Sequence, residues 1–121
     1  MNEPIVYDAS ALVELFNANP TAFDLWNNAE VGGWPVVFPA CAIAEANVSL
    51  NASYEAWHTV LWPYSTAVAP LDVSSAVEAG LRHRHDLATS HVTHEAKQIG
   101  GVVLTASPDK YSGGLIRVLV I

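Results

Sequence analysis

Asp8 is the first residue whose place in the sequence suggests chemistry. It follows the apolar run Ile5–Tyr7 and precedes the small residues Ala9 and Ser10, after which an apolar pattern of helical spacing begins. This order predicts a buried strand that leads into a helix, with a carboxylate at the carboxyl end of the strand. Ligands bind at that end of the strands in open α/β sheets. Because an uncompensated carboxylate within apolar sequence is costly, we predict a functional role for Asp8.

A second carboxylate, Glu45, lies on an apolar face of the helix expected after Pro39. Its neighbours one helical turn away are Cys41, Ala42, Val48 and Ser49. Buried, unpaired glutamates are rare, which favours a side chain that points toward Asp8 at the tip of the first strand. The alternative is an acid at the edge of the apolar stripe that extends into water.

Two further stretches carry candidate groups. Asp86 lies on a polar helical segment one turn after Arg82, where a surface ion pair is the alternative to a functional role. Farther along, a strand ends in small polar residues. There Thr105 and Ser107 could orient carboxylates or a metal-bound water through hydrogen bonds, and Asp109 adds a nearby acid. The alternative is an ordinary strand-end turn built on Ser-Pro-Asp.

Carboxylates that converge from several strand ends repel one another unless a cation lies among them. Mg²⁺ and Mn²⁺ accept such oxygen ligands and keep water in their remaining positions. A water bound to such a cation loses a proton more easily, so it can attack a phosphodiester while the cation stabilises the leaving oxygen. The acids therefore favour metal-dependent hydrolysis over other chemistries.

The elements that must position these groups alternate along the chain. We predict strands over about 5–7, 36–38, 66–71, 102–104 and 116–121, and helices over about 10–16, 20–32, 39–53, 54–62 and 73–99. Ser10 and either Asp72 or Ser74 are the expected helix N-caps, and Gly80 is a possible break in the last helix. Continuous apolar strands separated by helices predict a three-layer α/β/α sandwich with a five-stranded, mainly parallel sheet.

Composition limits the function classes. The 121 residues are enough for one domain over 1–121, and 51% hydrophobic with 14% charged residues excludes a disordered chain. The net charge of −7, with five Lys and Arg, argues against tight non-specific binding of nucleic acid. The apolar runs are too short to span a bilayer, no secretory signal pattern is present, and Cys41 is the single cysteine. We therefore expect a cytoplasmic protein that does not enter membranes.

Other site chemistries fit less well. Four histidines lie close together, yet their spacing is not that of the helical zinc hydrolases: His83, His85, His91 and His94. A receiver domain would need a phospho-accepting aspartate on its third strand and a lysine after its fifth. A haloacid-dehalogenase-like phosphatase would need Asp-x-Asp after the first strand, where this chain has Asp8-Ala9-Ser10.

In their order and spacing, these residues resemble a PIN domain, the small metal-dependent ribonuclease fold that includes the VapC-type toxins of prokaryotic toxin–antitoxin pairs. The matching stretches are Val6–Leu12, Phe38–Glu45, Asp86–Ala96 and Gly101–Tyr111. The resemblance implies that Asp8, Glu45 and Asp86 bind Mg²⁺ or Mn²⁺, with Ser10 and Thr105 as supporting hydroxyls.

The resemblance also implies RNA as the substrate, a homodimer, and an antitoxin protein as the partner. Exposed members of an aromatic-rich segment would suit such an interface: Tyr54, Trp57, Trp62 and Tyr64. Two departures stand out. Ser107 occupies the position where the family usually has an aspartate, and Asp86 precedes Thr105 by about one helical turn more than is common. Asp109 is the nearest acid that could replace the missing ligand. The alternative reading is a degenerate PIN-like domain that binds a protein without catalysis.

Overall fold

A five-stranded parallel sheet forms the centre of the computed structural model, which describes residues 3–81, 86–112 and 116–121. The strands lie in the order β3-β2-β1-β4-β5, and each neighbouring pair is parallel. Their bounds are β1 Ile5–Tyr7, β2 Val36–Pro39, β3 Thr66–Ala69, β4 Val102–Thr105 and β5 Val118–Val120. The predicted parallel sheet is confirmed.

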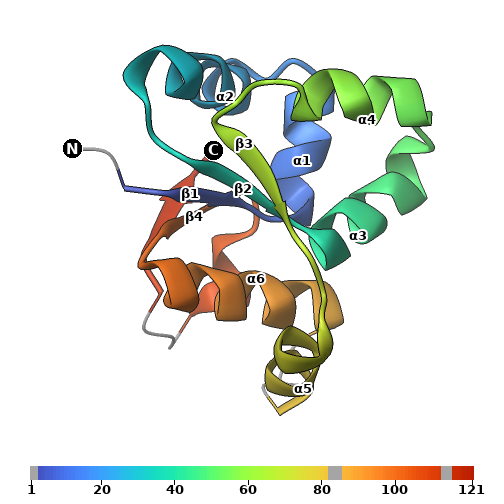
Figure 1. Cartoon of the computed structure of the whole chain (residues 1–121), viewed down its shortest axis with the longest axis vertical. Helices are drawn as coiled ribbons and strands as arrows, with labels where there is room; N and C mark the ends of the chain where they lie inside the picture. Colours follow the sequence, from blue (N-terminus) through green and yellow to red (C-terminus); the bar gives the residue numbers. More distant parts are fainter. Residues whose placement is uncertain (1–2, 82–85, 113–115) are drawn as a thin grey trace.

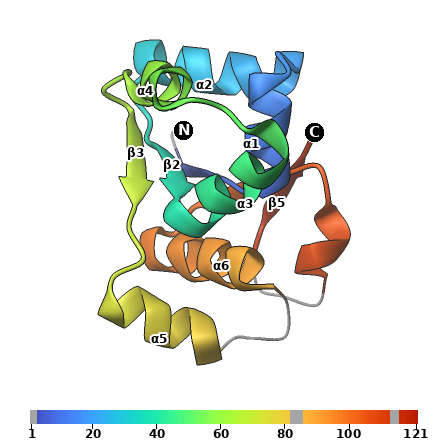
Figure 2. The same ribbon diagram turned by 90° about the vertical axis from the view of Figure 1, so that its right-hand side faces the viewer.

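Helices cover both faces of this sheet (Figure 1). On one side lie α1 Ala9–Phe16, α2 Pro20–Gly32 and α4 Tyr54–Leu61; on the other lie α5 Val73–Leu81 and α6 Leu87–Ile99. The remaining helix, α3 Ala40–Leu50, runs beside the sheet and packs against both α1 and α6 (Figure 2). The predicted three-layer sandwich is therefore confirmed. None of the helices in the described ranges is both long and apolar enough to cross a bilayer.

The chain changes direction across the sheet between β1 and β4. It first moves from β1 through β2 to β3, and later returns to place β4 and β5 on the opposite side of β1. The connections that follow β1 and β4 therefore diverge, which opens a crevice at the carboxyl ends of these two strands. Asp8 lies at this point, because its amide donates a 3.2 Å hydrogen bond to the Leu104 carbonyl of β4.

Two predicted helix boundaries, in α1 and α3, are wrong. The N-cap of α1 is Asp8 rather than Ser10, so the predicted ligand also begins the helix. The helix α3 ends at Leu50 rather than near Ser53, because Asn51 adopts a left-handed conformation with φ of 49°.

The predicted helical region 73–99 is two helices, α5 and α6. Gly80 lies inside α5, so the break falls beyond this glycine rather than at it. Asp86 is the N-cap of α6 and does not lie on the face of a continuous helix. Arg82, its predicted ion-pair partner, lies outside the described residues.

The two outer strands are shorter than predicted. β3 ends at Ala69, because Pro70 cannot donate to a neighbouring strand. Of the two predicted caps of the next helix, Asp72 accepts a 2.8 Å hydrogen bond from the Ser75 amide. β5 covers three residues of the predicted range 116–121.

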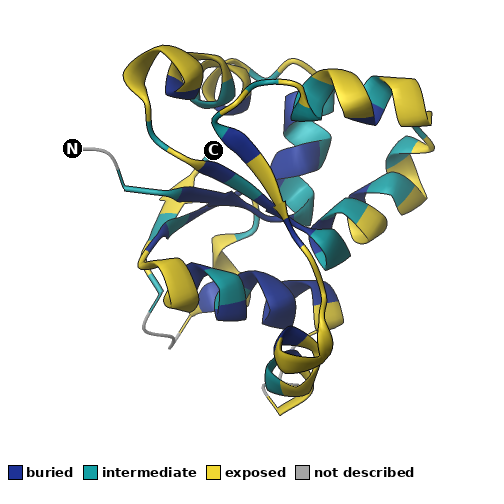
Figure 3. Cartoon of the chain, in the orientation of Figure 1, coloured by how far each residue is buried: buried dark blue, intermediate teal, exposed yellow. Residues whose placement is uncertain are grey.

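Most residues of the central strands β1, β2 and β4 are buried (Figure 3). The fully buried rings of Tyr7 and Phe38 lie 5.3 Å apart between β1 and β2. The Tyr7 hydroxyl donates a 2.5 Å hydrogen bond to the Ala22 carbonyl, which ties β1 to α2. Burial raises the pKa of the Tyr7 phenol, so the group remains a donor.

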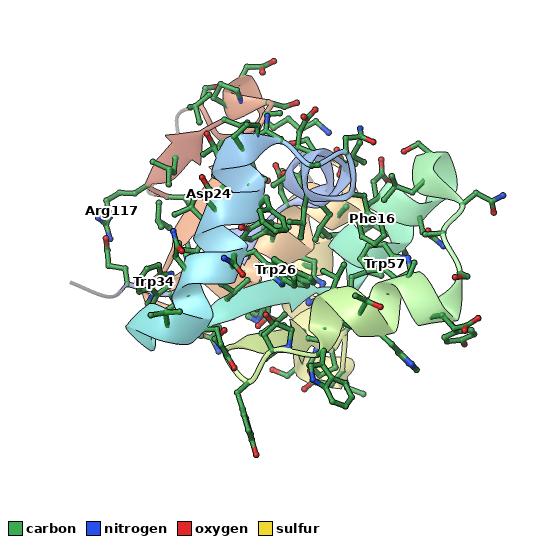
Figure 4. The ribbon with its side chains drawn as sticks, turned by 90° about the horizontal axis from the view of Figure 1, so that it is seen from above. Phe16, Asp24, Trp26, Trp34, Trp57 and Arg117 are labelled. Carbon is green, nitrogen blue, oxygen red and sulfur yellow. The ribbon has the colours of Figure 1, made fainter. Side chains whose placement is uncertain are left out.

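Aromatic contacts hold α4 against α1 and α2 (Figure 4). The rings of Phe16 and Trp57 lie 4.5 Å apart, and the Trp26 indole donates a 2.9 Å hydrogen bond to the Val60 carbonyl. Trp57 is thus part of the core. The other aromatic residues of this segment are exposed: Tyr54, Trp62 and Tyr64.

Candidate active site

A small cavity of about 20 Å³ lies where the chain changes direction at the carboxyl edge of the sheet. It is lined by the three predicted acids, Asp8 after β1, Glu45 on α3 and Asp86 at the start of α6. Residues from three separate elements therefore meet at one point. The volume suits one water molecule or one small ion.

Asp8 is buried, with 4% of its surface exposed, and three neutral groups bind its carboxylate. Its Oδ1 accepts from the Ser10 hydroxyl at 2.7 Å and from the Ala11 amide at 2.9 Å. Its Oδ2 accepts from the Tyr111 hydroxyl at 2.9 Å. These bonds compensate the buried charge without a cationic partner. Two donors occupy Oδ1, whereas Oδ2 accepts one hydrogen bond and keeps a lone pair for a further ligand.

The hydroxyls of Ser10 and Thr105 connect the ends of β1 and β4. They lie 3.3 Å apart, and Ser10 also accepts from the Ala106 amide at 2.9 Å. The fully buried Thr105 accepts from the Ser107 amide at 2.8 Å. Ser10 thus acts directly on Asp8, whereas Thr105 orders the strand end behind it.

Asp86 is a half-exposed cap with a charged neighbour. Its Oδ1 accepts from the Thr89 amide at 2.8 Å, and its Oδ2 lies 3.1 Å from the Thr89 hydroxyl and 3.3 Å from Lys110 Nζ. Partial burial alone would raise the pKa of this carboxyl. The hydrogen bonds from Thr89 and the charge of Lys110 outweigh burial and hold that pKa below its usual range.

Glu45 differs from both aspartates. Its side chain is exposed, and within the described part of the chain its carboxylate has no hydrogen-bond or ion-pair partner. It is therefore the acid in the cavity that is free to reorient toward a ligand.

Three predicted groups do not line the cavity: Thr105, Ser107 and Asp109. Ser107 contributes its backbone to the turn, where its carbonyl accepts from the Lys110 amide at 3.1 Å. Asp109 is exposed on the 3-10 helix η1 Pro108–Tyr111. The structure therefore brings together three of the four predicted ligands and leaves Asp109 apart.

Sequence reasoning missed two residues of this turn, Lys110 and Tyr111. Both line the cavity, and each binds one of the aspartates. Burial, followed by the charge of Asp8 and the hydrogen bond to it, raises the pKa of the Tyr111 phenol, so this group stays a donor. The signal in the sequence was their place directly after the polar end of the fourth strand.

The donor types suit a hard divalent cation. Three carboxylates and one ammonium leave a formal charge of −2 around the cavity, and hydroxyl and carboxylate oxygens are the donors that Mg²⁺ and Mn²⁺ prefer. Among residues 3–81, 86–112 and 116–121, no three His, Cys, Asp or Glu side chains are placed closely enough to hold an ion. Glu45 would therefore have to turn inward to complete a ligand set.

The histidine cluster has a structural explanation where it is described. His91 and His94 are buried on α6, and His91 lies 3.2 Å from Glu95 Oε2. His83 and His85 lie outside the described residues. Since no metal-binding group is formed in the described ranges, these side chains give no support to a zinc site.

Among the comparisons with known proteins, the fold is supported by solved structures. No family model and no curated protein matches the chain. Solved structures do match: a toxin–antitoxin complex from Klebsiella pneumoniae shares 15% identity over 95% of each chain, with a TM-score of 0.67. DNA-bound VapBC from Salmonella typhimurium shares 14% identity over 98% of each chain, with a TM-score of 0.68. FitAcB from Neisseria gonorrhoeae shares 17% identity over 95% of this chain and 96% of that chain, with a TM-score of 0.59.

The class of fold follows from these matches. The chain has the PIN-domain fold of the toxin component of VapBC complexes, as the sequence resemblance predicted.

Proposed function

We propose that the protein is a divalent-metal-dependent ribonuclease of the toxin type, in which Asp8, Glu45 and Asp86 hold Mg²⁺ or Mn²⁺. The observation that carries this proposal is the cavity that all three acids line at the carboxyl edge of a PIN-type sheet. Asp109 is left out of the proposed ligands, because it lies apart from this cavity.

A divalent cation at this place would supply positive charge and an activated water for attack on an RNA phosphodiester. The chain's own groups would prepare the site. Ser10 and Tyr111 fix both oxygens of Asp8, and the Thr89 amide fixes one oxygen of Asp86. Lys110 supplies an ammonium at the rim, where it can bind a phosphate oxygen once Asp86 is engaged by the ion.

The charge of the protein limits how RNA is recognised. With a net charge of −7 and five Lys and Arg, the chain offers few contacts to phosphates. We therefore propose recognition of a short segment around the scissile bond, which gives a shallow dependence of binding on salt.

A protein partner fits the same account. The structural neighbours include toxin–antitoxin complexes, and by analogy we propose an antitoxin partner and a homodimer for this chain. A groove of about 440 Å³ between α3 and α4 offers an apolar surface lined by Ile43, Tyr54, Trp57 and Leu61. It lies apart from the acidic cavity, with which it shares no residue.

The test is Mn²⁺ binding and RNA cleavage by the wild type and the Asp8→Asn variant. The asparagine keeps an acceptor for the Ala11 amide but loses the charge, so we expect cleavage to fall by about 100-fold or more with the fold intact by circular dichroism. Asp109→Asn is the matched control and should retain both properties. Unchanged cleavage in Asp8→Asn would exclude the proposed site.

Two observations favour a second candidate, a PIN-like domain that binds a protein without catalysis. Tyr111 and Lys110 already bind Asp8 and Asp86, and Ser107 stands where the resembled family usually has an acid. If neither the wild type nor Asp8→Asn gives a metal-dependent heat in calorimetry, this second function is the better account.

A further inference from the structure

His91 is a fully buried titratable residue for which the proposed reaction has no use. It lies on α6, and none of its side chain is exposed. Buried polar groups are stable only when they are hydrogen-bonded, and both ring nitrogens meet this condition. Nε2 lies 3.2 Å from Glu95 Oε2, and Nδ1 accepts from the Cys41 amide at 3.4 Å.

These partners determine where the ring carries its proton. The Cys41 amide can only donate, so this hydrogen bond requires an unprotonated Nδ1 and leaves the ring proton on Nε2, which faces Glu95. The Pro70 carbonyl is a further acceptor beside the ring. Glu95 Oε2 also accepts from the Ser75 hydroxyl of α5 at 3.2 Å. The imidazole thus links three helices: α3 through Cys41, α5 through Glu95 and Ser75, and α6 through its own backbone.

The bond to Cys41 compensates for a missing cap. The N-cap of α3 is Pro39, whose side chain accepts no hydrogen bond, and Cys41 carries one of the first-turn amides that lack a partner within the helix. His91 supplies the acceptor from another helix. Glu45 lies one turn beyond Cys41 on the same face of α3, and its side chain lines the cavity together with Asp86.

We propose that His91 is a positioning residue whose Nδ1 fixes the first turn of α3 against α6 and thereby places Glu45 opposite Asp8 and Asp86. The inference rests on the proposed function, in which Glu45 is a metal ligand. Without this acceptor, the start of α3 has one bond fewer to α6, and Glu45 samples positions outside the cavity more often.

Two substitutions separate this role from a general contribution to stability. The side-chain oxygen of asparagine reaches about the place of Nδ1, so His91→Asn retains an acceptor for the Cys41 amide. Glutamine reaches about the place of Nε2, so His91→Gln retains a partner for Glu95 but not for Cys41. Each variant loses one of the two buried hydrogen bonds, so both should lower the thermal midpoint to a similar extent.

The experiment measures Mn²⁺ affinity by titration calorimetry and the exchange rate of the Cys41 amide by NMR, on the full chain. We expect His91→Gln to weaken Mn²⁺ binding by about 10-fold and to speed the exchange, whereas His91→Asn stays within about twofold of the wild type. His58→Asn, at an exposed histidine of α4, is the control and should change neither quantity.

The possible results are distinguishable. A larger loss in His91→Gln than in His91→Asn supports the inference. A wild type that binds Mn²⁺, with the two variants weakened equally, overturns the inference and leaves the proposed function in place. A wild type that binds no Mn²⁺ overturns the proposed function, and with it the role of Glu45 on which the inference depends.

Discussion

Asp8 and Asp86 both cap the N-terminus of a helix, but they do so in different environments. Each is a helix N-cap whose Oδ1 accepts the amide three residues on, at 2.9 Å for Asp8 and 2.8 Å for Asp86. Asp8 is 4% exposed and bound by uncharged donors. The side chain of Asp86 is 44% exposed and pairs with Lys110.

The difference indicates a division of roles within one site. The buried aspartate is fixed in place before any ligand arrives, because three donors from the chain hold it. The half-exposed aspartate has a partner that water and salt can displace, since exposed ion pairs contribute little. A cation that enters the cavity would therefore meet one rigid carboxylate, one exchangeable carboxylate and the unpaired Glu45.

The largest expected contrast in stability is between two alanine variants. Asp8→Ala removes a cap and leaves the buried Tyr111 hydroxyl without an acceptor, so we expect the free energy of unfolding to fall by about 2–4 kcal/mol. Asp86→Ala removes a cap that water can partly replace, so we expect a loss of about 0.5–1 kcal/mol. Urea denaturation measures both, and equal losses would remove the distinction between the two carboxylates.

A smaller contrast concerns the two neighbours of these acids. Tyr111→Phe deletes one buried donor to Asp8 and should cost about 1–2 kcal/mol of unfolding free energy. Lys110→Met deletes an exposed charge and should cost less than about 1 kcal/mol, while Mn²⁺ binds more tightly because a competing cation is gone. Lys97→Met, at an exposed lysine in the last turn of α6, is the control for the loss of one positive charge. If Lys110→Met weakened Mn²⁺ binding, the competition between lysine and metal would be refuted.

The smallest expected effect is a decrease in stability as the pH falls into the acidic range. Because the pKa of Asp86 is lower in the folded chain than in the unfolded chain, its contribution is complete above the unfolded value of about 3.9. That contribution is lost as the pH falls through the folded value. Asp86→Asn should flatten this part of the profile of thermal midpoint against pH. A profile identical to that of the wild type would show that the Asp86 carboxylate does not stabilise the folded state through this shift.

The sequence predicted the sheet because its signal is local. The apolar runs of β1, β2 and β4 are bounded by Pro, Gly or small polar residues, and the helices between them require parallel pairing. The break between α5 and α6 was misplaced because the segment 82–85 contains neither Pro nor Gly. The spacing of Asp86 and Thr89 was the available signal that a new helix begins there.

The candidate site was predicted less completely, since its contacts are long-range. The acids stood out by their type and their place at strand ends. The hydrogen bond from Tyr111 to Asp8 joins residues 103 positions apart, and the pair of Lys110 and Asp86 joins residues 24 apart. Neither has a local pattern, and both depend on the switch of direction between β1 and β4.

The central claim is that three carboxylates of this cavity hold one divalent ion. The most direct measurement is anomalous diffraction from crystals of the wild type grown with Mn²⁺. We predict one peak at about 2.1–2.2 Å from oxygens of Asp8, Glu45 and Asp86, with Lys110 turned away from Asp86. A cavity without a peak at saturating Mn²⁺, or a peak bound only by histidines of α6, would contradict the account.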